Sequence, residues 1–138
     1  DNLRLMGNEL RRTHGNDYIV AEYVKRFQDQ KIQNCVIESI RALAEVKTLK
    51  NKGGILLAID ANPQMRYERI QARKSASDSI SFEKFTEQEA IEMNDPDPNG
   101  MQKAKVMQRA DYTIDNASSL EVLHRQIDEV LKKIQSEK

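Results

Sequence analysis

Two short apolar runs constrain the fold of this chain more than any other feature. The first is Cys35-Val36-Ile37, and the second extends without interruption from Ile55 to Ile59. Runs this short cannot complete a helix, and unbroken β-branched and aliphatic sequence is typical of strands buried on both faces. We therefore expect buried strands at 34–38 and 55–59, with Cys35 in the core and its thiol inert to reagents.

Helical patterns precede, separate and follow these runs. Leu3, Met6 and Leu10 form an apolar stripe on a first helix, which His14-Gly15-Asn16 ends. A third short strand is predicted at Tyr112-Thr113-Ile114. The remaining helices are predicted at about 17–30, 43–50, 62–74, 82–93 and 101–109, and from a capping box at 118–121 onward, with a loop at 94–100. Strands that alternate with helices predict an α/β fold with a parallel sheet.

Size and charge exclude several classes of protein. The 138 residues are enough for one domain with a hydrophobic core, and we expect a single domain over 1–138. Lys and Arg number 22, as do Asp and Glu, which disfavours a nucleic-acid or membrane-surface binder. No apolar stretch reaches the ~20 residues of a membrane helix. A single cysteine favours a reducing compartment, so a cytoplasmic protein is expected.

A carboxylate and a guanidinium follow the first predicted strand. Glu38 ends it, and Arg41 comes three residues later. In open α/β sheets the ligand crevice lies outside the carboxyl ends of the strands, so both residues are placed for a polyanion or its metal ion. The alternative is that Glu38 caps the next helix and Arg41 makes a surface ion pair.

Three arginines share one face of the helix predicted after the second strand. Arg66, Arg69 and Arg73 are spaced at i, i+3 and i+7, so their guanidinium groups could clamp phosphates through bidentate hydrogen bonds. A solvated helix face in which Glu68 pairs with its neighbours is the alternative.

No metal site is predicted. Residues 95–100 (Asp-Pro-Asp-Pro-Asn-Gly) begin like an EF-hand loop, but Val106 stands where the bidentate Glu is needed. His14 and His124 have no Cys or His at ligand spacing. The sequence also contains no glycine-rich phosphate loop.

Several segments resemble the P-loop nucleoside-monophosphate-kinase superfamily. Residues 110–123 (Ala-Asp-Tyr-Thr-Ile-Asp-Asn-Ala-Ser-Ser-Leu-Glu-Val-Leu) look like the C-terminal segment of dephospho-coenzyme A kinases. Residues 68–73 are similar to the helix that leads into the lid of adenylate kinases. Glu38 to Arg41 resembles the strand end where an Arg of these kinases meets the acceptor phosphate. Asn2-Leu3, Asn8 to Arg11 and Gly15 to Ile19 resemble archaeal adenylate-kinase-like proteins.

The resemblance implies a three-layer α/β/α fold and an activity. Such an enzyme transfers the γ-phosphoryl group of ATP, with Mg²⁺, to a nucleotide-like acceptor, mainly by positioning and charge stabilisation. The resemblance implies catalytic roles for Glu38, in the magnesium–water network, and for Arg41, on the acceptor phosphate. Arg69 and Arg73 would hold the ATP phosphates or stack on its base, and Asn116 would lie beside the adenine.

The chain departs from the superfamily at its front. The strand, the glycine-rich loop with its Lys and the helix that open these kinases are missing, so we expect this chain alone to be inactive. The missing strand would lie between those matching 34–38 and 55–59, which leaves two apolar edges exposed. We therefore expect that the two strands close onto each other, or that another segment fills the gap, in a homo-oligomer or by pairing with a missing N-terminal segment. A lid-like region is expected at about 74–100. The alternative function is a non-catalytic interaction or regulatory module.

Overall fold

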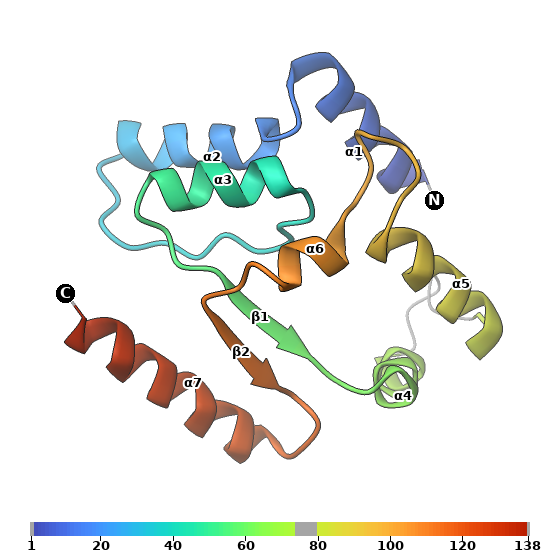
Figure 1. Cartoon of the computed structure of the whole chain (residues 1–138). Helices are drawn as coiled ribbons and strands as arrows, with labels where there is room; N and C mark the ends of the chain where they lie inside the picture. Colours follow the sequence, from blue (N-terminus) through green and yellow to red (C-terminus); the bar gives the residue numbers. More distant parts are fainter. Residues whose placement is uncertain (1, 74–79, 138) are drawn as a thin grey trace. The chain divides into compact units, whose positions relative to one another are not determined.

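A computed structural model describes residues 2–73 and 80–137 and shows a mixed fold of helices and strands (Figure 1). In chain order the elements are α1 (Asn2–His14), α2 (Tyr18–Asp29), α3 (Leu43–Asn51), β1 (Leu57–Asp60), α4 (Pro63–Arg73), α5 (Phe82–Met93), α6 (Lys103–Met107), β2 (Tyr112–Asp115) and α7 (Leu120–Ser136). In the described residues the strands form one parallel pair, which confirms an α/β composition.

The chain falls into two compact units. The first comprises Asp1–Leu56 and Gln88–Arg109, and the second comprises Leu57–Glu87 and Ala110–Lys138. Helix α5 therefore contributes residues to both. The single domain over 1–138 and the lid-like region at about 74–100 stay predictions, and residues 74–79 lie outside the described part of the chain.

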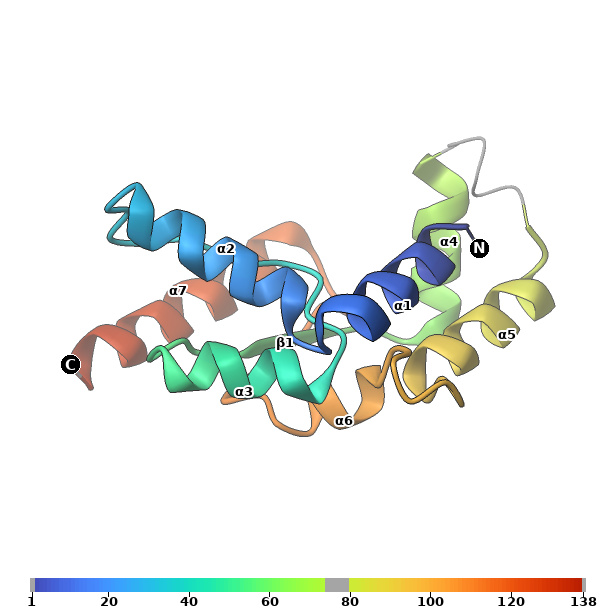
Figure 2. The ribbon, with the colours of Figure 1, turned by 90° about the horizontal axis from the view of Figure 1, so that it is seen from above.

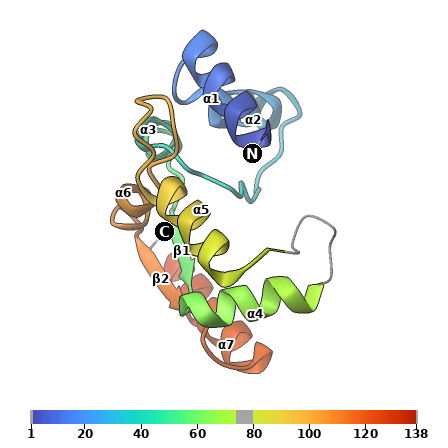
Figure 3. The same cartoon turned by 90° about the vertical axis from the view of Figure 1, so that its right-hand side faces the viewer.

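The second unit contains the strand pair. Leu57 is in register with Tyr112 and Asp60 with Asp115, and the Asn116 N–H donates to the Asp60 carbonyl oxygen at 2.7 Å just beyond the pair. Ile114 is fully buried, and α7 packs beside β2 (Figure 3). The strands predicted at 55–59 and 112–114 are confirmed, although β1 begins two residues later than expected.

The first unit is built from helices. Helices α2 and α3 lie side by side, as both Figure 1 and Figure 2 show, and α1 contacts α2. Val20 of α2, Val46 of α3 and Val106 of α6 are buried and form its apolar interior. The last of these helices, α6, is shorter than the 101–109 that periodicity predicted.

The strand predicted at 34–38 is wrong. Residues 34–40 form no regular secondary structure, Val36 is 93% exposed and the Cys35 thiol is exposed rather than in the core. A strand persists only where a neighbouring backbone satisfies its N–H and C=O groups. Within the described residues β1 pairs with β2, and no backbone pairs with 34–38.

Two predicted apolar stripes also differ from the structure. Leu3 of α1 is 85% exposed and Met6 is exposed as well, whereas Asn8 and Arg11 of the same helix are buried. In α7 no described residue is buried, although periodicity predicted a core stripe there. The four-residue strand β2 is the element with which α7 makes its main contacts, so much of the stripe stays at the surface.

Local capping signals were more reliable than the stripes. The Asn62 side-chain oxygen accepts a hydrogen bond from the Gln64 N–H at 2.8 Å at the start of α4, as expected for an N-cap. Ser119 caps α7 through the Val122 N–H at 3.4 Å.

No helix within 2–73 or 80–137 has the length and apolar character needed to cross a membrane.

Candidate functional site

The first unit contains a cavity of about 530 Å³. It is bounded by α1, α2, the irregular segment before α3, and the end of α5. Its lining residues are Leu3, Arg4, Gly7, Arg11, Ile19, Tyr23, Glu38, Ser39, Arg41, Gln88, Ile91, Glu92 and Met101. The lining thus combines apolar side chains with charged ones, as ligand pockets usually do.

Guanidinium groups dominate the charge of this cavity. Arg4, Arg11 and Arg41 line it, against the two lining carboxylates Glu38 and Glu92. An excess of guanidinium groups in a partly apolar cavity favours an anionic ligand, because these groups match the geometry of phosphate and carboxylate oxygens.

Arg11 is the most unusual of the three. It is only 3% exposed, and its Nη2 donates to Glu45 Oε1 at a long 3.5 Å. Its Nε and Nη1 have no hydrogen-bond partner among residues 2–73 and 80–137. A Cβ at Gly7 would lie 3.4 Å from Nη1, so the absence of a side chain there leaves room for the buried guanidinium beside α1. Buried unpaired donors cost about 1–3 kcal/mol each, which an anion in the cavity would offset.

Arg41 is held at both its backbone and its side chain. Its N–H donates to Glu45 Oε2 at 2.7 Å, and its carbonyl oxygen accepts from the Gln102 N–H at 2.7 Å. Its Nη1 pairs with Glu92 Oε2 at 3.4 Å. The structure therefore places Arg41 at the cavity with its backbone fixed.

Glu38 and Ser39 complete this side of the cavity. Glu38 is exposed at the rim, near enough to solvent for water-mediated contacts. Ser39 has φ 66°, a left-handed conformation that few non-glycine residues adopt. The chain thus turns sharply between Glu38 and Arg41, and both residues line one cavity.

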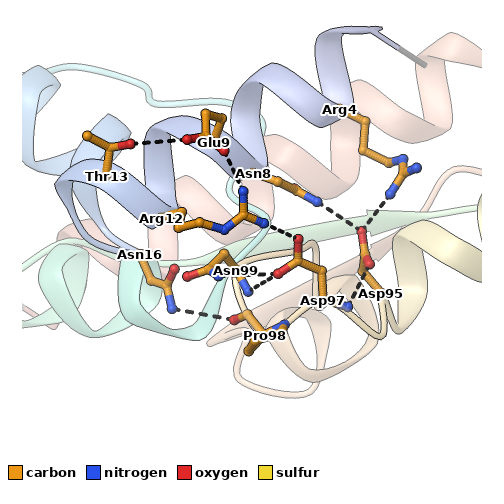
Figure 4. A network of polar contacts seen from close by, with 10 residues as sticks. All are labelled: Arg4, Asn8, Glu9, Arg12, Thr13, Asn16, Asp95, Asp97, Pro98 and Asn99. Carbon is orange, nitrogen blue, oxygen red and sulfur yellow. Dashed lines mark hydrogen bonds and ion pairs between the residues drawn. The ribbon is translucent and has the colours of Figure 1, made fainter.

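The turn Asp95–Gly100, called the acidic turn below, is bound along α1 (Figure 4). Arg4 Nη1 contacts Asp95 Oδ2 at 2.9 Å, and Arg12 Nη2 contacts Asp97 Oδ2 at 2.8 Å. Two amides add weaker bonds: Asn8 Nδ2 to Asp95 at 3.4 Å and Asn16 Nδ2 to the Pro98 carbonyl at 3.5 Å. The Asp95 side chain is 3% exposed, so this contact positions Arg4 at the cavity from a buried partner.

Hydrogen bonds favour the ionised form of both aspartates. Burial by itself would raise the pKa of Asp95, but the Asp97 N–H and the side chains of Asn8 and Arg4 outweigh it and lower that pKa below its ordinary value. The Asn99 N–H, assisted by the Asn99 side chain and the Arg12 charge, lowers the pKa of Asp97. Both are therefore acceptors at neutral pH.

The second unit contains the residues assigned to the nucleotide by resemblance. Arg69 Nη1 donates to the Asn116 carbonyl oxygen at 2.8 Å, so these two predicted residues come together. Arg66 pairs with Asp60 at 2.8 Å, and Arg73 lies exposed at the end of α4. Arg66 is therefore used in an ion pair within its own unit.

Sequence reasoning missed the roles of Arg4, Arg11 and Glu45. Arg11 lies in a segment that resembles adenylate-kinase-like proteins, but apolar periodicity assigned the buried face of its helix to Leu3, Met6 and Leu10. Glu45 follows Arg41 by four residues, a spacing at which helical residues meet, and this is the one available signal.

In the described part of the chain no group of three or more His, Cys, Asp or Glu side chains gathers to bind a metal.

Comparison with known proteins identifies archaeal relatives. The chain is 27% identical over 135 residues to a UPF0200 protein of Staphylothermus marinus, with 97% of the chain covered. It is 31% identical over 130 residues to a UPF0200 protein of Methanococcus vannielii, with 91% covered. A UPF0200/UPF0201 protein of Archaeoglobus fulgidus is 30% identical over 139 residues, with 97% covered. These names state no activity or substrate.

The chain spans only part of these relatives. It covers 68% of the Staphylothermus protein, 66% of the Methanococcus protein and 41% of the Archaeoglobus protein. No protein-family model matches the chain, and no solved structure matches it significantly.

Proposed function

We propose that the chain is part of a nucleotide-binding phosphotransferase of the nucleoside-monophosphate kinase or dephospho-coenzyme A kinase type. It would help to transfer the γ-phosphoryl group of ATP to a nucleotide-like acceptor bound in the cavity of the first unit. The fold would be the three-layer, P-loop kinase-like arrangement implied by the resemblance in Sequence analysis.

The buried guanidinium of Arg11 is the observation that carries this proposal. Its two unpaired nitrogens belong to a residue that lines the cavity, and Arg41 lines the same cavity. A phosphate has enough oxygens to accept from both residues, and charge-assisted hydrogen bonds of this kind are among the strongest in proteins. Arg41 was assigned to the acceptor phosphate by resemblance, and the position of Arg11 supports that assignment independently.

The apolar part of the lining suits the remainder of a nucleotide. Leu3, Ile19, Tyr23, Ile91 and Met101 line the same space as the arginines. A flat base needs apolar and aromatic contact, whereas a free phosphate does not. A volume of about 530 Å³ is within the range of small-molecule sites.

The residues assigned to ATP and Mg²⁺ could contact the water shell of the ion and the phosphates of the nucleotide. Mg²⁺ keeps most of its waters and uses one or two carboxylates together with substrate phosphates, so a lone exposed Glu38 could contact its water shell. Arg69, whose Nη1 reaches the Asn116 carbonyl, and the exposed Arg73 lie on α4 and could hold the nucleotide phosphates. ATP would supply the phosphoryl group, and Mg²⁺ would neutralise its charge.

The acceptor part of the proposal is tested by calorimetric titration of this chain with nucleoside monophosphates and the matching nucleosides. We expect at least one monophosphate to bind about tenfold or more tightly than its nucleoside, because the nucleoside cannot accept from Arg11 and Arg41. Arg11→Met should reduce this difference. Arg11→Met removes one partner of a buried ion pair and leaves Glu45 bonded to two backbone N–H groups, so the fold of the variant is checked first by circular dichroism.

Arg12→Met is the matched control. Arg12 is the next residue of α1, but it does not line the cavity and pairs with Glu9 and Asp97 at the surface. Equal binding of nucleotide and nucleoside, or no binding of either, would contradict the proposal. Phosphoryl transfer from ATP should be absent with this chain alone and present with the full-length Methanococcus vannielii relative.

The alternative is a non-catalytic interaction or regulatory module derived from the same fold. The apolar residues Leu3, Leu5 and Met6 on α1 are more than half exposed, and this favours contact with another protein. A full-length relative that binds no nucleotide would favour this alternative.

A further inference from the structure

Glu45 connects two of the three arginines of the cavity, Arg11 and Arg41, through one buried carboxylate. It lies in the first turn of α3 and is 1% exposed. Its Oε2 accepts from the Arg41 N–H at 2.7 Å and from the Ala42 N–H at 2.9 Å. Its Oε1 accepts from Arg11 Nη2 at 3.5 Å. One oxygen therefore binds the backbone at the start of α3, and the other binds the Arg11 side chain of α1.

These contacts fix the two arginines in different ways. The bonds to Oε2 hold the backbone where Arg41 leaves the sharp turn at Ser39. The contact to Oε1 takes one nitrogen of Arg11 and leaves Nε and Nη1 without partners in the described residues. The guanidinium of Arg11 is thereby oriented with two donors remaining for another acceptor.

We propose that Glu45 is a positioning residue, whose carboxylate holds Arg11 and the Arg41 backbone so that both arginines act on one anionic group of a ligand. This inference rests on the proposed function, which places a phosphate group in the same cavity. Glu45 itself is covered by protein and would not touch the ligand.

If Glu45 acted only through its charge, its substitution would change the affinity for an anion in the opposite direction. A carboxylate close to a phosphate site lowers the local positive potential, so removal of its charge should strengthen the binding of an anion. If Glu45 positions the arginines, the same substitution should weaken binding. The direction of the change therefore separates the two roles.

The test is an NMR titration of the 138-residue chain and its variants with inorganic phosphate. Glu45→Gln keeps an oxygen for the backbone N–H groups of Arg41 and Ala42 but loses the charge that pairs with Arg11. We expect phosphate to bind about tenfold more weakly, the size seen when a group that orients a ligand-binding residue is removed.

Glu92→Gln is the matched comparison. Glu92 lines the cavity and pairs with the side chains of Arg41 at 3.4 Å and of Lys103 at 3.2 Å, and among the described residues it makes no hydrogen bond to the Arg41 backbone. Its removal frees a guanidinium and should strengthen phosphate binding. Opposite effects of two Glu→Gln changes beside the same arginine would support positioning by Glu45.

Two further measurements keep the inference testable if Glu45→Gln folds poorly, and a third applies if it folds. Glu45→Asp retains the charge but shortens the reach, so it should also weaken phosphate binding. In the native chain the Arg11 Nε–H resonance should shift on addition of phosphate, and that of Arg12 should not. In an Arg11→Met background, Glu45→Gln should have a much smaller effect than in the native chain.

Tighter or unchanged phosphate binding by both Glu45 variants would overturn the inference. It would leave the proposed function intact if the native chain still bound a nucleoside monophosphate more tightly than its nucleoside. Failure of the native chain to bind phosphate would overturn the inference as well. Failure to bind any nucleotide would instead overturn the proposed function.

Discussion

The guanidinium of Arg11 lies in the interior of the first unit with one ion-pair partner, Glu45, at 3.5 Å. Such a pair stabilises a fold little, since desolvation of both charges offsets their attraction. Its arrangement is better suited to ligand binding, because the contact leaves two nitrogens of Arg11 unpaired on a residue that lines the cavity.

At the scale of single residues, Arg41 and Arg73, two of the three arginines assigned by resemblance, should affect the binding of different ligands. In a parent protein that also contains the phosphate loop, Arg41→Ala is expected to weaken the binding of a nucleoside monophosphate by about 1.5–3 kcal/mol, the range for hydrogen bonds to charged partners, while ATP binding changes little. Arg73→Ala should do the reverse. Calorimetric titration of each variant with both ligands provides the measurement.

Small and equal effects of the two substitutions would mean that both arginines are ordinary surface groups. Lys47→Ala is a suitable control, because Lys47 is an exposed cation of α3 that does not line the cavity. It should change neither affinity.

At the scale of elements, α1 and the acidic turn form a pH-dependent contact. The pKa values of Asp95 and Asp97 are lowered in the folded chain, so their contribution is present above the ordinary carboxylate pKa and is lost as the pH falls through the lowered values. Asp95→Asn should therefore cost about 1.5–3 kcal/mol at pH 7, with a smaller cost well below pH 3.8. Urea unfolding at several pH values measures this.

Asp128→Asn provides the comparison, because Asp128 is exposed on α7. Its substitution should change the free energy of unfolding by no more than about 0.5 kcal/mol. A cost for Asp95→Asn that stays the same from pH 7 to below pH 3 would show that the carboxylate charge does not hold the turn to α1.

The elements that could be predicted from the sequence were those with local signals. The Phe82–Met93 helix and the Asn62 cap agree with prediction, because capping and periodicity act within a few residues. The strand at 34–38 failed because a strand depends on a partner that its own sequence does not specify. Similarly, the buried Arg11 and Glu45 depend on a contact between α1 and α3, and the buried Asn8 contacts the acidic turn. Hydrophobic periodicity cannot detect such contacts.

The candidate site could be predicted only in part, because only some of its residues give a local signal in the sequence. Glu38 and Arg41 were found because they follow an apolar run, and both line the cavity even though that run is not a strand. Arg69 and Asn116 were found by resemblance and meet in the structure. Arg11 and Glu45 were missed as site residues, since charges that neutralise each other across distant segments leave no pattern in a single sequence.

At the scale of the whole molecule, the exposed strand β1 predicts self-association. A two-stranded sheet is marginal by itself, and Leu57 and Ile59 of β1 remain exposed. We expect light scattering after size-exclusion chromatography to give a mass above that of a single chain at micromolar concentration. Ile59→Lys should shift the distribution toward the monomer, because a charge on an exposed strand face opposes its burial.

Leu120→Lys is the control for that experiment, because Leu120 is an exposed apolar residue of α7 outside the strands. It should leave the mass unchanged. A native chain that stays monomeric at the highest concentrations tested would rule out association through β1.

The incompletely paired Arg11 links the stability of the fold to the solution around it. A ligand that binds only the folded chain raises the free energy of unfolding by RT ln(1 + [L]/Kd), about 2.7 kcal/mol at a hundredfold excess over Kd. The native chain should therefore melt at a higher temperature in phosphate than in chloride at equal ionic strength, and Arg11→Met should lose that dependence on the buffer. Thermal melting can thus rank anions and nucleotides as ligands of the cavity before any reaction has been assigned.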